Sequence, residues 1–167
     1  EIRLNTEVTQ ALIEREAPGV LVLAVGAAPI VPDIPGIRSP KVVLATSLSD
    51  EGIVVGEKVV ILGGGLVGCE SAVHLAQQGK DVTVVEMMEE VAVDANVRQR
   101  PILLDMLAKL GVKVETRMKG VKITGEGLVC TDETGKEKLF QGDTVVCSVG
   151  QRALREVVND LLDAAPE

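Results

Sequence analysis

The sequence predicts an α/β fold in which a strand–helix–strand unit builds a parallel central sheet and an antiparallel β-meander follows it. Three observations predict this fold. Short runs rich in Val and Leu recur along the 167 residues and are bounded by Gly or charge, as in strands buried on both faces of a parallel sheet. A helix-spaced apolar pattern separates two of these runs. Short runs divided by turn residues then follow in the second half.

The composition favours a soluble protein and excludes several classes of partner. The apolar fraction is 46%, but the apolar runs are too short to span a membrane. The net charge is −8, with no Trp, no Tyr and one Phe, so we expect no nucleic acid partner. Cys69, Cys130 and Cys147 form no CxxC pair. We therefore expect no metal site and a cytoplasmic location.

A proline-rich connector is expected near the start of the chain. Val20–Val25 is an apolar run closed by Gly26, and it predicts a buried strand. Pro29, Pro32 and Pro35 then exclude regular structure. We expect a domain boundary after this connector, near residue 40.

The central unit is predicted between this connector and Glu86. Residues 66–78 indicate a helix with one wide apolar face, and Gly79 is placed to cap its end. A strand, a helix and a second strand within about thirty residues predict a right-handed parallel crossover. The other expected elements are strands at 42–44, 58–62 and 81–86 and a helical turn near 47–51.

The second half predicts a helix, a meander and a last buried strand. The helix ends near Leu110 with Pro101 in its first turn, and Gly111 stops it. A strand at 112–115 precedes the runs VKIT, LVCTD and KEKLF, which are separated by turn signals. The run at 144–149, closed by Gly150, resembles the run closed by Gly26, and we expect paired exits from the domain there.

The main chemical signal is a glycine motif between a predicted strand and a predicted helix. It has the form G-x-G-x-x-G, typical of a Rossmann-type dinucleotide-binding domain. The first glycine allows the turn, the second admits the diphosphate, and the third lets the helix pack closely, while the helix N-terminus faces the phosphates. We assign cofactor binding to Gly63, Gly64, Gly65, Leu66, Val67 and Gly68.

Glu86 ends the second strand of this unit and stands 86 − 63 = 23 positions after the first glycine. An acid about 20 positions on is the expected ligand of the adenosine ribose and opposes a 2′-phosphate, which favours NADH over NADPH. Met87 and Met88 are expected to cover the adenine, and no Arg or Lys follows nearby to neutralise a phosphate. The alternatives are a glycine turn without a ligand and an acid that only solvates a strand end.

Two further polar side chains, those of Glu70 and His74, lie on the predicted helix. Glu70 either complements the helix dipole or has a role in the site. His74 has no carboxylate or Cys at a ligand spacing, and we assign it no role. We identify no general acid, base, nucleophile or metal ligand in the chain.

With these residues in place, the chain resembles the pyridine nucleotide-dependent flavoprotein reductases, in which an NADH domain is inserted into a split FAD domain. The resemblance spans about residues 20–153 through LAVGAAPIVPDIPGI, VVILGGGLVGCESAVHLAQQGKDVTVVE and DTVVCSVGQRA. GGGLVGCE and AAPIVPDIPGI most resemble the carboxyl-terminal half of 2,4-dienoyl-CoA reductases and related NADH:flavin oxidoreductases of the old-yellow-enzyme type.

The resemblance implies roles for particular residues and regions. Glu86 corresponds to the ribose-binding acid, Glu70 and Gly150 to groups near the nicotinamide, and Gly26 and Ala27 to the crossover beside FAD. Residues 1–40 correspond to the remnant of an FAD-domain crossover and linker, 41–150 to the NAD(H)-binding Rossmann domain, and 151–167 to the start of the return to the FAD domain.

The chain departs from the family in lacking an earlier G-x-G-x-x-G and a later Gly-Asp flavin motif. We therefore expect a part of a larger enzyme, in which NADH passes a hydride to a flavin. FAD, and with it FMN and an iron-sulfur cluster in the old-yellow-enzyme type, would be bound elsewhere, and the chain alone would be inactive. The alternatives are a non-enzymatic NAD(H)-sensing module and a glycine loop that binds FAD, although roughly sixty residues precede the loop.

Overall fold

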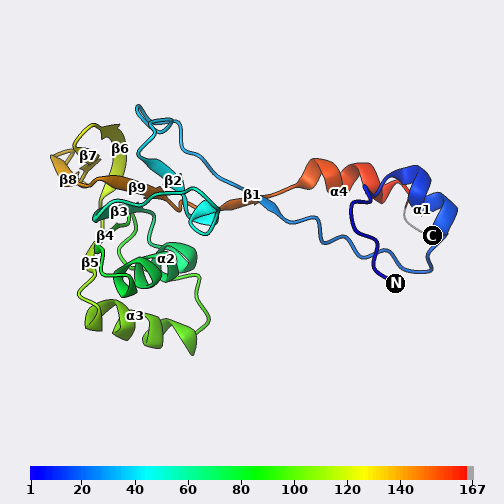
Figure 1. Cartoon of the computed structure of the whole chain (residues 1–167), viewed down its shortest axis with the longest axis horizontal. Coiled ribbons are helices and arrows are strands. Elements are labelled where there is room, and N and C mark those ends of the chain that lie inside the picture. Colours follow the sequence, from blue (N-terminus) through cyan, green and yellow to red (C-terminus); the bar gives the residue numbers. More distant parts are fainter. Residues whose placement is uncertain (165–167) are drawn as a thin grey trace. The chain divides into compact units, whose positions relative to one another are not determined.

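The computed structural model describes residues 1–164 and divides the chain into two compact units. The larger unit is Pro29–Gly150, and the smaller one combines Glu1–Ala28 with the chain from Gln151 onward. Figure 1 labels the four α-helices of the described residues and most of the strands. Of the helices in the described part, none has the length and apolar character needed to cross a bilayer.

The larger unit contains a five-stranded parallel sheet, as the sequence predicted. Its strand order is β2-β9-β3-β4-β5, and each neighbouring pair is parallel. The strands are β2 (Val42–Leu44), β3 (Lys58–Leu62), β4 (Asp81–Val85), β5 (Lys113–Glu115) and β9 (Thr144–Cys147). A 3-10 turn, η1 (Ala45–Ser47), follows β2.

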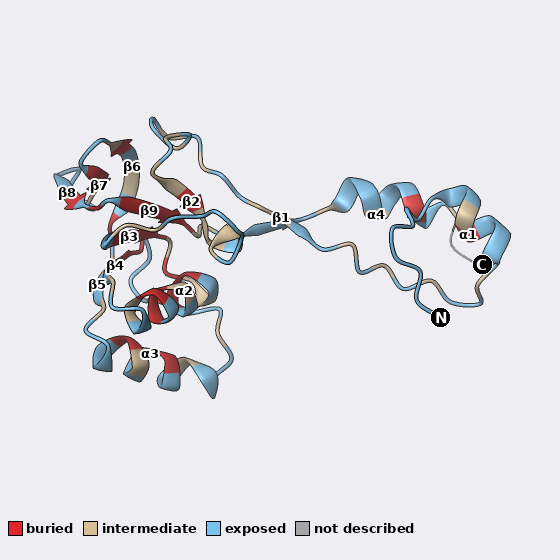
Figure 2. Cartoon of the chain, in the orientation of Figure 1, coloured by how far each residue is buried: buried red, intermediate tan, exposed pale blue. Residues whose placement is uncertain are grey.

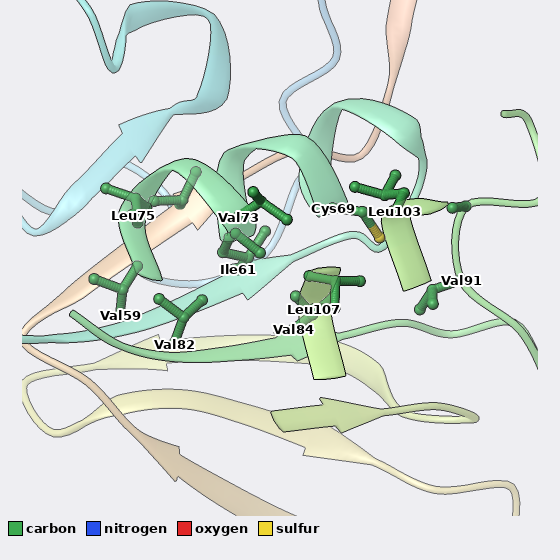
Figure 3. Close-up of a cluster of buried hydrophobic side chains, with 13 residues drawn as sticks. Val59, Ile61, Cys69, Val73, Leu75, Val82, Val84, Val91, Leu103 and Leu107 are labelled. Atoms are coloured by element: carbon green, nitrogen blue, oxygen red, sulfur yellow. The ribbon is translucent and has the colours of Figure 1, made fainter. Parts of the chain in front are cut away.

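Helices lie on one face of this sheet. α2 (Leu66–Gln77) packs on β3 and β4, and α3 (Gln99–Lys109) packs on α2. Alternate residues of β3 pack on opposite faces of the sheet, because successive side chains of a strand point in opposite directions. Figure 3 shows the helix-side cluster, with Cys69, Val73 and Leu75 of α2 lying against Val59, Ile61, Val82 and Val84 of the strands.

An antiparallel sheet covers the other face. It consists of β6 (Lys119–Thr124), β7 (Gly127–Thr131) and β8 (Glu137–Gln141) in that order. Leu128, Cys130 and Phe140 of this meander are buried together with Val60 and Leu62 of β3. The predicted meander is thus confirmed, and it forms a third layer. Figure 2 shows buried residues in the strands of both sheets.

The connector before β2 packs with the larger unit. Ile34 and Ile37 contact the cluster on the meander side, and the Ile123 amide donates to the Pro35 carbonyl across 2.8 Å. The larger unit therefore begins at Pro29, whereas the sequence analysis placed its boundary near residue 40.

The smaller unit contains two helices that the sequence analysis did not predict. They are α1 (Gln10–Glu16) and α4 (Arg155–Leu162). Thr9 caps α1 by accepting from the Leu12 amide at 3.3 Å, and the Gln10 side chain donates to the Asp160 carbonyl of α4 at 2.6 Å. Two short strands, β1 (Ala27–Pro29) and β10 (Gln151–Ala153), pair with each other directly after Gly26 and Gly150.

The predicted buried strand at Val20–Val25 was wrong. The segment is not a strand, and Val20 and Val22 are 78% and 81% exposed. Val and Leu favour strands only where a neighbouring strand accepts their backbone hydrogen bonds and a layer covers their side chains. In the described part of the smaller unit, β10 pairs with β1. No strand there pairs with Val20–Val25, so the segment lacks the partner that a strand requires.

Candidate functional site

The parallel register brings three strand ends to one edge of the sheet. β3 pairs with β4 up to Leu62 opposite Val85, and with β9 up to Leu62 opposite Cys147. Gly63 and Glu86 therefore leave the sheet side by side. The carboxyl ends of parallel strands are where α/β proteins of this type bind ligands.

Gly63 makes the turn from β3 toward α2. Its φ is +104°, and a Cβ on it would lie 2.3 Å from the Ser148 carbonyl oxygen. Its amide donates to the Val85 carbonyl at 2.9 Å. Because only glycine takes this conformation without strain, no other residue fits here.

Gly68 lies in the first turn of α2, directly against this bend. A Cβ at Gly68 would lie 2.0 Å from the Gly63 carbonyl oxygen. The helix therefore approaches the turn more closely than any side chain would permit. This is the close packing that the third glycine of the motif requires.

Gly65 is the N-cap of α2. Because glycine has no side chain, this residue provides no side-chain cap for the helix N-terminus. An acid from elsewhere takes that place, since the Leu66 amide donates to Asp94 Oδ1 across 2.7 Å. A Cβ on Gly65 would meet the two Asp94 carboxylate oxygens at 3.3 and 3.4 Å. Within residues 1–164, the amides of Gly65 and Val67 donate to no protein group.

Glu86 is 9% exposed and is held by backbone amides. Its Oε2 accepts from the Gly64 amide at 2.6 Å, and its Oε1 accepts from the Met88 amide at 2.8 Å. These bonds tie the end of β4 to the glycine loop. An ionised carboxylate has about four acceptor positions, so two remain for other donors.

Residues 87–98, named here the crossover loop, fold back over the glycine loop. The Ala92 amide donates to the Gly64 carbonyl at 2.7 Å, and Val91 Cγ1 lies 2.7 Å from where a Gly64 Cβ would stand. The Arg100 side chain donates to the Val91 carbonyl at 3.1 Å. The sequence analysis missed this arrangement and Asp94 with it, because both depend on tertiary contacts.

Arg117 brings a cation to the segment after Glu86. Its amide donates to the Met88 carbonyl at 2.9 Å, its φ is +56°, and its guanidinium pairs with Glu89 and, at 3.6 Å, with Glu133. The sequence analysis looked for Arg or Lys only in the residues that follow Glu86. None occurs in residues 87–90, and the cation comes instead from the loop between β5 and β6.

The remaining predicted residues lie around the loop. Met87 and Met88 are 63% and 55% exposed, and Val67 is 42% exposed, so these side chains are accessible. Glu70 accepts from the Gln99 side chain at 2.8 Å and borders a groove of about 730 Å³ between α2 and α3. Gly150 has φ +112° and its carbonyl accepts from the Ile30 amide at 3.0 Å.

The cysteines are core residues. All three are buried and free. Burial raises the pKa of the Cys69 thiol to about 11 and that of Cys130 to about 12. No group of three or more potential metal ligands occurs among the described residues.

Comparison with known proteins places this geometry in a family. Residues 6–164 match the family described as pyridine nucleotide-disulphide oxidoreductase. Bilirubin reductase of Mediterraneibacter gnavus is 36% identical over 152 residues, which cover 91% of this chain and 24% of that protein. NADH oxidase of Thermoanaerobacter brockii is 32% identical over 158 residues, covering 90% of this chain and 24% of that protein.

A solved structure shows the same relationship at the level of the fold. The 2-naphthoyl-CoA reductase complex with 2-naphthoyl-CoA superposes with a TM-score of 0.85 at 32% identity, and the match covers 99% of this chain and 25% of that one. The chain thus spans about a quarter of the length of these relatives. The extent of the family match shows that the chain belongs to the pyridine nucleotide-disulphide oxidoreductase family.

Proposed function

We propose that this chain is the NADH-binding domain of a larger flavin-dependent oxidoreductase. Its role is to hold NADH for hydride transfer to a flavin bound by other parts of that enzyme. The observation that carries the proposal is the side-chain-free bend at Gly63–Gly65, which lies at the N-terminus of α2 beside the Glu86 carboxylate. Family membership and the quarter-length match support it.

The residues at the bend fit a diphosphate. A helix N-terminus carries partial positive charge and unpaired amides, and here the amides of Gly65 and Val67 have no partner within residues 1–164. Gly65 has no side chain to fill the space in front of them, and the atoms nearest to a Cβ there would be those of the Asp94 carboxylate. The diphosphate of NADH, which carries two negative charges, would be bound by such donors.

The chain's own contribution is binding and orientation. NADH, when bound, supplies a hydride from C4 of its nicotinamide, and the flavin accepts it at N5. The glycine loop would hold the diphosphate and Glu86 the adenosine ribose, which fixes the distant half of the cofactor and limits the positions of its reactive ring. We assign no acid, base or nucleophile to this chain.

Glu86 supports a preference for NADH over NADPH. Its carboxylate is already placed by two backbone amides, and an acid at this position accepts from ribose hydroxyls and repels a 2′-phosphate. Arg117, the cation near this segment, is paired with Glu89 and Glu133. As long as these pairs hold, the guanidinium is not available to a 2′-phosphate.

We further propose that the parent enzyme is of the 2,4-dienoyl-CoA reductase and NADH:flavin oxidoreductase type. The motifs GGGLVGCE and AAPIVPDIPGI support this assignment, and reductases are among the relatives that this chain matches over about a quarter of their length. In such a parent, FAD, FMN and an iron-sulfur cluster would be held outside this chain.

Titration calorimetry of the 167-residue chain with NADH and NADPH tests the proposal. We expect saturable binding of NADH, weaker binding of NADPH, and a purified chain without flavin absorbance. Equal affinity for the two cofactors would remove the proposed role of Glu86. One flavin bound per chain would contradict the assignment of the loop to NADH.

A further inference from the structure

We propose that Asp94 is an internal anion that competes with the cofactor's diphosphate for the N-terminus of α2. NADH would then bind fully only after this carboxylate has turned away, and Asp94 would set the affinity of the site. The proposal rests on the function proposed above and deepens it, because it names a residue that controls occupancy of the same loop.

The position of the Asp94 carboxylate carries the inference. Oδ1 accepts from the Leu66 amide at 2.7 Å, and both carboxylate oxygens lie 3.3 to 3.4 Å from where a Gly65 Cβ would stand. The second glycine of the motif lacks a side chain so that a diphosphate can approach the backbone. A carboxylate therefore occupies the space, and uses one of the donors, that the diphosphate would need.

The surroundings of Asp94 allow the carboxylate to leave. Asp94 is exposed, and the hydrogen bond that its carboxylate accepts within residues 1–164 comes from the Leu66 amide. Rotation about its side chain would release the amide and place the charge in water. Val91 and Ala92, only 6% and 0% exposed, would keep the crossover loop in place during that rotation.

Glu86, the other acid at the loop, differs in this respect. It is buried and accepts from two amides, those of Gly64 and Met88. Moving it would leave the buried Gly64 amide without a partner, which is costly. Of the two acids, Glu86 is thus fixed in the site and Asp94 is exchangeable.

A purely structural role for Asp94 predicts the opposite effect. If Asp94 only caps α2 and orders the glycine loop, its removal would loosen the loop and weaken NADH binding. If Asp94 competes with the diphosphate, its removal would strengthen binding, because the like charge disappears and, where no other acceptor replaces it, the Leu66 amide is freed as well. The sign of the change in affinity separates the two roles.

The test compares NADH dissociation constants of the full 167-residue chain and its Asp94→Asn and Asp94→Ala variants. Asn keeps an oxygen that can accept from Leu66 but loses the charge, so folding should be retained. We expect NADH to bind about three- to tenfold more tightly to both variants. Inorganic diphosphate, added as a competitor of NADH, should likewise bind more tightly to the two Asp94 variants than to the unaltered chain.

Asp105→Asn is the matched control for the change in net charge. Asp105 is an exposed acid on α3 that pairs with Lys109 at 2.7 Å, and its loss should leave NADH affinity within about twofold. Thermal unfolding of each variant checks folding, and Asp94→Asn alone carries the test if the Ala variant does not fold.

Each outcome decides the proposal. Tighter binding to the Asp94 variants than to Asp105→Asn supports it, including the case in which only the Asp94 variants bind measurably. Unchanged or weaker binding to Asp94→Asn overturns the competition, while NADH binding by the unaltered chain leaves the proposed function standing. Absence of NADH binding in every variant overturns both.

Discussion

The Glu86 carboxylate accepts a hydrogen bond from the Gly64 amide across 2.6 Å. This contact joins the end of β4 to the loop that follows β3. It places the proposed ribose ligand beside the proposed phosphate loop, and such preorganisation lowers the entropic cost of binding. Glu86 therefore has a structural role in addition to its proposed role in recognition.

Replacing Glu86 should affect stability and cofactor preference together. Glu86→Ala leaves the Gly64 and Met88 amides without their acceptor, and we expect a loss of about 1–3 kcal/mol in the free energy of unfolding. The ratio of NADPH to NADH dissociation constants should fall toward one. Chemical denaturation and calorimetry measure the two effects, and Glu126→Gln, at an exposed turn, is the control. An unchanged ratio would show that Glu86 is structural only.

Gly63 should not tolerate a side chain. Gly63→Ala puts a Cβ against the Ser148 carbonyl at a φ of +104°, and we expect a cost of about 1–3 kcal/mol from the backbone conformation alone. Gly125→Ala is the matched control, because a Cβ there has no neighbour within 4 Å. Urea denaturation compares the two variants, and equal midpoints would argue against the tight turn.

Release of Arg117 should raise the affinity for NADPH. Glu89→Gln weakens the ion pair that holds the guanidinium, and we expect NADPH to bind a few-fold more tightly while NADH changes little. Because the pair is exposed, stability should change by less than about 1 kcal/mol. The double variant Glu89→Gln/Arg117→Met should not show this increase in NADPH affinity. A gain that persists in the double variant would exclude Arg117 as its source.

The three thiols should be inert in the folded chain. Burial raises the pKa of Cys69 to about 11 and of Cys130 to about 12, and it also raises the pKa of Cys147. Thiolate, the reactive form, is therefore scarce at pH 8 and increases only as the pH approaches these values. Alkylation followed by mass spectrometry should label the cysteines slowly before urea is added and rapidly after it. Fast labelling of Cys69 in the folded chain would contradict its burial.

The sequence predicted the parts of the fold that depend on local pattern. β3, α2 and β4 followed from apolar periodicity and from the spacing between Gly63 and Glu86. Asp94 and Arg117 could not be found in this way, because loops fold back to bring them to the site. Their local signals, an acid before a helix and a cation before a strand, are common on protein surfaces.

The smaller unit shows the limit of the same reasoning. The run Val20–Val25 has the composition of a buried strand, but strand formation depends on a partner, and composition does not supply one. Conversely, α1 and α4 are short, and their pairing through Gln10 and Asp160 joins segments 150 residues apart. Local periodicity contains no information on such a contact.

A crystal structure of the chain with NADH tests the central claim most directly. The account predicts diphosphate oxygens within hydrogen-bonding distance of the Gly65, Leu66 or Val67 amides, the adenosine ribose on Glu86, and the Asp94 carboxylate turned into solvent. NADH bound away from the glycine loop, with Asp94 still on the Leu66 amide, would contradict it.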